Sequence, residues 1–444
     1  MAFVTFIRAP NNYLYPSLNG EEGFLFPLVY NGIRLTDIVH LPGFNYAMAV
    51  PAALGYAVSF LAVEYIPYAM TFVSLACVTV TFGWLALPRY RRVFPSDRFR
   101  ELACVIIAIL PLAHYSLIST LMSMHWIAFL LMTFLVLVPL PPKLLAKAVQ
   151  TLAMGMIAWS HPMCVTLLPV LAFRAWTAES VVDRRCYLGV AVVIAAFPVL
   201  GTYYLNSTGS NLDAGTVAGY TLDFIAQKIA FEAVFGNHLR ELALASLGSG
   251  FFVAYLILVV TACALGVWTL RHRLAREQWF HLSYFTWLGV ALPTLFIILR
   301  NPAPESFLSD QSQIYTFVPK IHFLLLASYL IAAVAHARGC RLRARPAVAA
   351  GLVGWALVVA LYNRTAYRGS VELGFVTQRV VERVYQAERK VGRRNVSMTI
   401  HDPLRGGWLI VMRSRSEWKV IRRARAAFWY GPIVRRLLDA LRGQ

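Results

Sequence analysis

The stretch Gly250-Phe-Phe-Val-Ala-Tyr-Leu-Ile-Leu-Val-Val-Thr-Ala-Cys-Ala-Leu-Gly-Val-Trp-Thr-Leu270 decides the fold class of this chain. It carries no charged side chain and is long enough to cross a bilayer, which takes roughly 17–25 apolar residues in a helix. Over the whole chain, 59% of the 444 residues are hydrophobic and only 14% are charged. A soluble protein of this size would expose too much apolar surface to water. The sequence therefore predicts an all-α polytopic membrane protein.

Apolar runs between polar breaks predict about ten transmembrane helices. They lie near 66–87, 101–120, 123–140, 145–160, 164–178, 187–205, 250–270, 279–299, 319–337 and 347–363. A further apolar stretch, 43–62, is interrupted by Pro51 and Gly55. It either spans the membrane or lies along its interface, so the predicted count is ten or eleven.

The basic residues predict the orientation of these helices. Short Arg-rich loops follow the runs that end near 87, 178, 270 and 337, and the positive-inside rule places such loops in the cytoplasm. Alternation then places the chain start, 206–249 and 300–318 outside. This holds if 43–62 is interfacial, whereas a spanning 43–62 would move the start of the chain to the cytoplasm.

Charge and cysteine content narrow the range of partners. The formal net charge is +20, and in a membrane protein anionic lipid headgroups are a simpler counterpart than nucleic acid. The six cysteines are scattered, with no CxxC pair and no Cys/His cluster, which predicts neither disulfides nor structural zinc.

Three regions are expected. Residues 1–65 form a first external loop with interfacial helices, 66–363 form the transmembrane domain, and 364–444 form a small α/β tail. Alternation of the spans places this tail outside, whereas its basic charge leaves a cytoplasmic tail as the alternative. The tail contains a predicted helix near 376–390, a strand-like segment at 396–400 and a basic amphipathic helix between 418 and 441. Such a basic amphipathic helix suits an anionic membrane surface.

An acidic pair lies ahead of the spans. Glu21 and Glu22 stand in the segment Leu18-Asn-Gly-Glu-Glu-Gly23, in a chain with few acids. A carboxylate held at a bilayer surface is costly unless water, a metal ion or a substrate satisfies it. The alternative interpretation is a solvated turn whose acids have no chemical role.

Several motifs, in this order, are similar to those of the GT-C superfamily of integral-membrane glycosyltransferases, and of a mostly uncharacterised bacterial branch in particular. The quoted stretches are the acidic segment 18–23, Ser119-Thr-Leu-Met-Ser-Met-His-Trp126, Ser160-His-Pro162, Ile314-Tyr-Thr-Phe-Val-Pro319, and Ile400-His-Asp-Pro403 with Gly407-Trp408. Two departures stand out: no span precedes the acidic loop, and Ile314 replaces an Arg of the family pattern.

The resemblance implies an inverting transfer of a sugar from a polyprenyl-phosphate donor to a glycan or lipid-linked acceptor. One of Glu21 and Glu22 would be the general base that takes the acceptor proton. The resemblance further implies substrate-binding residues that stabilise the leaving phosphate or line the site: Arg300, Lys320, Arg240, Tyr315, His125 and Trp126. It leaves open a divalent cation, Mg²⁺ or Mn²⁺. Two acids without a second cluster favour an enzyme without metal.

Each of these residues also has an ordinary structural interpretation. Arg300 and Lys320 at span ends could extend to the headgroups, Trp126 could anchor at the interface, and His125 could pack as a hydrogen-bonded residue. The rival function is a transporter or flippase of lipid-linked saccharides. Transporters carry ionisable residues in the middle of the membrane, whereas here the span interiors hold almost no charge. The transferase would lie in a bacterial inner membrane, with its active site facing the periplasm or exterior.

Overall fold

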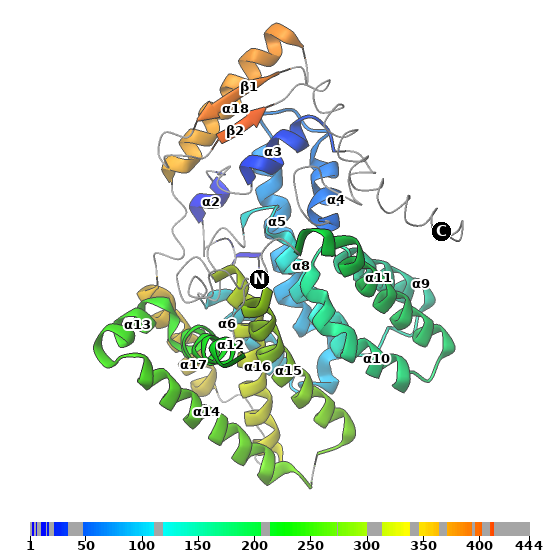
Figure 1. Cartoon of the computed structure of the whole chain (residues 1–444), viewed down its shortest axis with the longest axis vertical. Coiled ribbons are helices and arrows are strands. Elements are labelled where there is room, and N and C mark those ends of the chain that lie inside the picture. The colour runs from blue at the N-terminus through cyan, green and yellow to red at the C-terminus, as the bar shows by residue number, and fades with distance from the viewer. Residues whose placement is uncertain are drawn as a thin grey trace. The chain divides into compact units, whose positions relative to one another are not determined.

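The structure is a computed structural model of the whole chain (Figure 1). It describes residues 2–3, 6, 10–14, 16, 22–33, 48–110, 119–205, 214–272, 274–299, 313–337, 346–363, 371–392, 396–401 and 409–412. Two units are described separately. The first comprises Met1–Pro10, Leu75–Ser119 and Ser123–Gly369, and the second comprises Asn11–Ser74, Thr120–Met122 and Ser370–Gln444.

Helices dominate both units, as the composition predicts. The first unit contains η2 (Trp84–Ala86), η3 (Pro88–Arg92), α6 (Asp97–Ile109), α8 (Met124–Leu137), α9 (Leu144–Ala158), η4 (Pro162–Leu167), α10 (Leu168–Thr177), α11 (Val181–Leu205), α12 (Ala214–Asp223), η5 (Phe224–Phe231), α13 (Glu232–Leu247), α14 (Ser249–Leu270), α15 (Arg276–Leu299), α16 (Gln313–Ala337) and α17 (Pro346–Tyr362). The second unit contains most of α2 (Pro10–Leu14), α3 (Glu22–Tyr30), α4 (Ala49–Val58), α18 (Val371–Val391), β1 (Met398–His401) and β2 (Leu409–Met412). Helix α5 (Ile66–Gly83) begins in the second unit and ends in the first.

A helix occupies each of the ten ranges predicted to be apolar spans. Among the described residues, three helices are long and apolar enough to cross a membrane: Ile66–Ala86, Ser249–Leu270 and Thr316–Val334. These three indicate a membrane protein, and the full count of ten or eleven spans stays a prediction. Helix α4, inside the ambiguous stretch 43–62, has 10 residues. At 1.5 Å per residue it covers about half of a hydrocarbon core of roughly 30 Å, which favours the interfacial interpretation.

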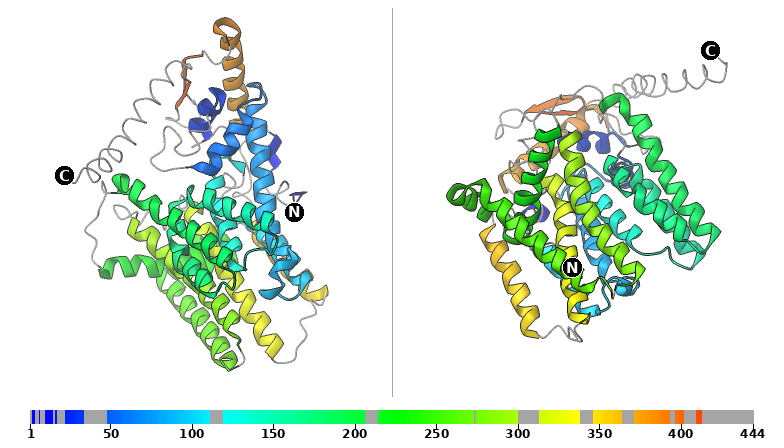
Figure 2. Two further views of the ribbon diagram at one scale, coloured as in Figure 1. Left: turned by 90° about the vertical axis from the view of Figure 1, so that its right-hand side faces the viewer. Right: turned by 60° about the horizontal axis from the view of Figure 1, so that its bottom comes forward.

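Helix α8 forms the packing centre of the first unit. All of its described side chains except Leu131 are buried. The antiparallel helices α15 and α16 pack side by side in all views (Figures 1 and 2). Tyr284 on α15 donates its hydroxyl proton to the carbonyl of Thr133 on α8 at 2.5 Å. Trp287 donates from its indole nitrogen to the carbonyl of Thr166 at 2.9 Å. The hydroxyl of Tyr284 and the indole N–H of Trp287 thus hydrogen-bond α15 to neighbouring helices, while their rings pack in apolar surroundings.

The Arg-rich loop after α5 is built by local capping. Ser96 precedes α6, and its hydroxyl accepts a hydrogen bond from the backbone N–H of Phe99 at 3.3 Å. Asp97 follows in the first turn, where a carboxylate interacts favourably with the helix dipole. Its carboxylate also pairs with Arg91 and Arg100, and the hydrogen bond from Arg91 holds the pKa of Asp97 below its usual range.

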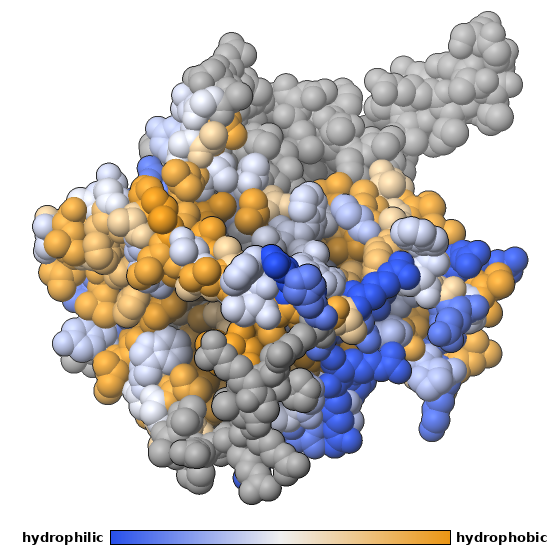
Figure 3. Space-filling view, turned by 90° about the horizontal axis from the view of Figure 1, so that it is seen from below, coloured by the Kyte–Doolittle hydropathy of each residue, from blue (hydrophilic) through white to orange (hydrophobic). Residues whose placement is uncertain are grey.

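Large apolar areas remain on the surface. On α14, the side chains of Ile257, Leu258 and Val260 are each more than half exposed. The face seen in Figure 3 shows wide hydrophobic areas beside a group of hydrophilic residues. Apolar surface of this extent suits contact with lipid.

The second unit contains the described strands. β1 and β2 pair antiparallel, with Thr399 opposite Val411 and Ile400 opposite Ile410. Helix α18 covers the predicted helix at 376–390, and β1 overlaps the predicted strand at 396–400. The predicted basic helix between 418 and 441 lies outside the described residues, so a tail domain of its own stays a prediction.

Candidate functional site

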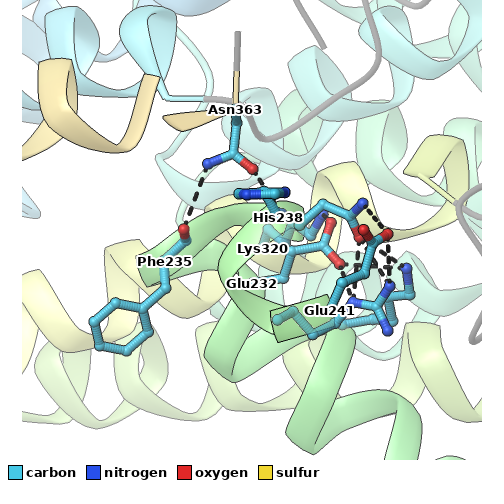
Figure 4. A network of polar contacts seen from close by, with 9 residues as sticks. Glu232, Phe235, His238, Glu241, Lys320 and Asn363 are labelled. Atoms are coloured by element: carbon cyan, nitrogen blue, oxygen red, sulfur yellow. Dashed lines mark hydrogen bonds and ion pairs between the residues drawn. The ribbon is translucent and has the colours of Figure 1, made fainter. Parts of the chain in front are cut away.

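A buried group of ionised side chains lies in the first unit, where η5, α13 and α16 meet (Figure 4). Lys320 donates from Nζ to Oε1 of Glu232 at 2.5 Å. Lys228 Nζ and Arg240 Nε each lie 3.4 Å from the other carboxylate oxygen, Oε2. None of the four side chains is more than 4% exposed. We call these four residues the Glu232 cluster.

A kink in the backbone brings the local members of the cluster together. Lys228 and Glu232 are four residues apart, a spacing that places them on one helical face. Gly236 then has φ +81°, a left-handed conformation that favours glycine. This kink turns the chain so that Arg240 reaches back to the carboxylate. Asn237 Oδ1 accepts hydrogen bonds from Arg240 at 2.9 Å and from Lys228 at 3.4 Å.

Asn363, just after α17, fixes the kink from a distant part of the chain (Figure 4). Its Oδ1 accepts from the backbone N–H of His238 at 2.9 Å, and its Nδ2 donates to the carbonyls of Val359 at 2.7 Å and Phe235 at 3.5 Å. A Cβ atom at Gly236 would clash with this side-chain amide. The kink and the amide therefore fit only when residue 236 has no side chain.

The cations decide the ionisation of Glu232. Burial alone would raise the pKa of its carboxyl, but Lys320, Lys228 and Arg240 outweigh this effect and hold the pKa below its usual value. Among the described residues, Glu241 is a second acid near Arg240, at 3.6 Å, and its side chain is 46% exposed. Three cationic groups thus meet at one shielded place, where water screens charge weakly.

The lowered pKa of Glu232 predicts a pH dependence of stability. Because its folded pKa lies below the unfolded value of about 4.3, the unfolded state binds more protons between the two values. The stabilisation by the ionised carboxylate is therefore complete above about pH 4.3 and is lost as the pH falls through the folded pKa. We expect the melting temperatures of the wild type and Glu232→Gln, measured in micelles, to differ by a constant amount from about pH 8 to about pH 5. The difference should narrow below about pH 4.3, and a difference that widened there would contradict the assignment.

Two predicted phosphate-binding residues, Lys320 and Arg240, are brought together in the cluster. The segment 206–249, predicted as a long external loop, is helical in its described part, where residues 214–247 form α12, η5 and α13. Its external position stays a prediction. Sequence reasoning placed Glu232 and Lys228 in that loop and missed their role. Their spacing of four residues at the end of an apolar stretch was the available signal.

The other predicted residues are described only in part. Glu21 and Arg300 lie outside the described residues. Glu22 is the first residue of α3, and Tyr315 lies in the first turn of α16, but the side chains of both are outside the described part. A base role for the acidic pair therefore stays a prediction.

His125 and Trp126 lie at the start of α8, and both are buried, at 2% and 7% exposure. Their rings pack against His161 with centroid distances of 5.2 and 4.2 Å, and Phe129 stacks on the same ring at 4.9 Å. His161 also accepts a hydrogen bond at Nδ1 from the backbone N–H of Met163. Trp126 is too buried to be an exposed interfacial anchor. Together with His125, Phe129 and His161 it forms a packed group of rings in the protein interior.

No group of three or more His, Cys, Asp or Glu side chains that could hold a metal ion is present in the part of the chain that the structure describes. No protein-family model and no curated protein matches the sequence. The residues and their geometry therefore carry the functional argument.

Proposed function

We propose that the chain is an inverting GT-C-type glycosyltransferase that moves a sugar from a polyprenyl-phosphate donor to a glycan or lipid-linked acceptor. The supporting observation is the Glu232 cluster. Lys320 lies close to the start of the apolar helix Thr316–Val334, and if that helix spans a bilayer, its ends would lie near the level of the lipid phosphates. Arg240 and Lys228 add two further cations at the same place.

In the proposed reaction, Glu21 or Glu22 accepts the proton of an acceptor hydroxyl. The hydroxyl oxygen attacks the anomeric carbon from the face opposite the phosphate, and the bond between that carbon and the phosphate oxygen breaks. The lipid phosphate leaves with the electron pair, so its negative charge rises by one. Lys320, Arg240 and Lys228 stabilise this added charge in surroundings that screen it weakly.

Glu232 has a separate role in this proposal. With no donor bound, its carboxylate is a counter-ion of the three cations, and it limits the cost of burying them. A donor phosphate would compete for the same cations. We propose that Glu232 holds the cations in place for the phosphate and takes no part in proton transfer.

The test is sugar transfer from a panel of radiolabelled polyprenyl-phosphate sugars, with purified protein in proteoliposomes. We expect Glu21→Gln or Glu22→Gln to reduce kcat by roughly 10²–10⁴-fold, because the loss of a general base costs that much. Glu101→Gln, an exposed acid on α6, is the matched control and should keep full activity. Arg240→Lys should mainly raise KM for the donor, since a lysine cannot hold a phosphate with two parallel hydrogen bonds.

A transporter or flippase of lipid-linked saccharides is the second candidate, and buried histidines favour it. Neither ring nitrogen of His281 on α15 has a hydrogen-bond partner among the described residues, and the side chain is fully buried. His322 on α16 is equally buried and engages only Nδ1, with the carbonyl of Val318. Ionisable residues inside apolar helices are typical of transport pathways. Movement of the donor across the proteoliposome bilayer without sugar transfer would favour this candidate and contradict the transferase.

A further inference from the structure

The second unit contains a half-open pocket of about 340 Å³ between the start of α5 and one face of α18. Its volume lies at the small end of the range for small-molecule sites, roughly 300–1,000 Å³. Glu64 lines it from the turn just before α5, Tyr68 lines it from the first turn of α5, and Gln378, Glu382 and Tyr385 line it from α18. The residues that line the pocket all belong to the second unit, and those of the Glu232 cluster all belong to the first.

Helix α18 presents its pocket residues through simple helical spacing. Positions 378, 381, 382 and 385 share one face, because 381 and 382 each lie three or four residues from both 378 and 385. The neighbouring face is held in place, because Val380 and Val384 are buried. The hydroxyl of Tyr30 on α3 also donates to Oε2 of Glu388 at 3.3 Å. The wall of the pocket that α18 supplies therefore rests on a regular helix.

The chemistry of the lining selects the ligand class. It combines two carboxylates, one side-chain amide and two tyrosine rings, and no Lys or Arg is among the described residues that line it. The Arg389 guanidinium carbon lies 5.9 Å from the centroid of the Tyr385 ring. The charged groups of the lining itself are two carboxylates, which disfavour phosphates and other anions. Carboxylate and amide oxygens accept hydrogen bonds from neighbouring hydroxyl groups, and a tyrosine ring offers a flat apolar face with a polar edge. This combination fits the hydroxyl groups and C–H faces of a sugar ring.

The position of the pocket suits a substrate that approaches along the membrane surface. Pro67 and Tyr68 belong to the first turn of α5, and the candidate span runs from Ile66 to Ala86. Just before it, Phe60 and Tyr65 are 64% and 63% exposed. Exposed aromatic residues next to a span are typical of the interfacial layer. This would place the pocket at the level of the headgroup layer.

We infer that this pocket binds an uncharged saccharide, through Glu64, Gln378 and Glu382 as hydrogen-bond acceptors and Tyr68 and Tyr385 as ring contacts. The inference rests on the proposed function in one respect: the saccharide is assigned as the acceptor of the transfer. The acceptor is then a neutral glycan, and the sugar that the pocket binds carries no phosphate group.

The test is direct binding of the full-length protein in micelles to an array of unphosphorylated neutral oligosaccharides, with phosphorylated oligosaccharides and spermidine as comparators. Calorimetry then measures Kd for the best neutral binder. We expect Kd to rise by about tenfold or more in Glu64→Gln/Glu382→Gln, because hydrogen bonds to charged acceptors are lost. Tyr385→Ala should weaken binding similarly. Glu179→Gln, an exposed acid outside the pocket, is the control and should bind like the wild type.

Three results would overturn the inference: no neutral oligosaccharide binds, only spermidine or phosphorylated sugars bind, or the pocket variants bind as tightly as the wild type. The assay needs neither donor nor turnover, so it is independent of the transferase test. Saccharide binding without donor consumption would keep the pocket and refute the transferase. If the pocket variants transferred sugar at the wild-type rate, the transferase would stand and the pocket would not be its acceptor site.

Discussion

Glu232→Gln is expected to lower the free energy of unfolding by about 3–5 kcal/mol, the usual cost of removing one partner from a buried ion pair. The reason lies in the cations that remain. Lys320, Lys228 and Arg240 would keep their charges in a shielded place while losing the carboxylate that they share. Denaturant titration of the purified protein in micelles, followed by tryptophan fluorescence, measures the loss.

Glu241→Gln is the matched control for this substitution. Glu241 also pairs with Arg240, but its side chain is 46% exposed, and exposed ion pairs contribute about 1 kcal/mol or less. A small effect of Glu241→Gln beside a large effect of Glu232→Gln is the expected pattern. Equal losses in the two variants would mean that burial does not set the strength of the Glu232 cluster.

Gly236→Ala is the second substitution with a large expected effect, a loss of about 3 kcal/mol. Alanine is strained at φ +81°, and its Cβ would displace the side-chain amide of Asn363. The hydrogen bonds of Asn363 to His238 and Val359 would then be broken or distorted. The melting temperature in micelles measures the effect.

Gly155→Ala provides the comparison for this glycine. Gly155 lies inside α9, and a Cβ there would meet no atom within 4 Å. Alanine is the better helix former by about 1 kcal/mol, so this variant should melt at the same temperature as the wild type or higher. If Gly236→Ala behaved in the same way, the kink at 236 would have no role in holding the cluster.

The positions of the helices could be predicted from local sequence. The uncharged run at 250–270 becomes α14, Ser249–Leu270, because apolar length and the flanking Gly248 define it without any tertiary information. Ser96 and Asp97 likewise define the start of α6 by capping. Membrane crossing is harder to predict, because a short apolar helix such as α9 can pack inside the protein or face lipid.

The Glu232 cluster could be predicted only in part. Lys320 was identified as a cation at the start of a span, and Arg240 as a cation within an external loop. Their meeting point was missed, because the pair of Lys320 and Glu232 joins residues 88 positions apart. No local pattern encodes a contact of that separation. The helices of 214–247 also bury residues, such as Glu232 and Lys228, that were expected in that loop.

The winding of η5 has a consequence for how this protein tolerates changes in chain length. Residues 224–231 form a π-helix, whose backbone hydrogen bonds join residues five apart, whereas those of an α-helix join residues four apart. Deleting one residue there would allow ordinary α-helical winding, because the wide turns of a π-helix already accommodate an extra residue. Lys228 would then lie three or four residues before Glu232, and both spacings keep the pair on one helical face. We therefore expect a one-residue deletion in this segment to preserve the ion pair of Lys228 and Glu232.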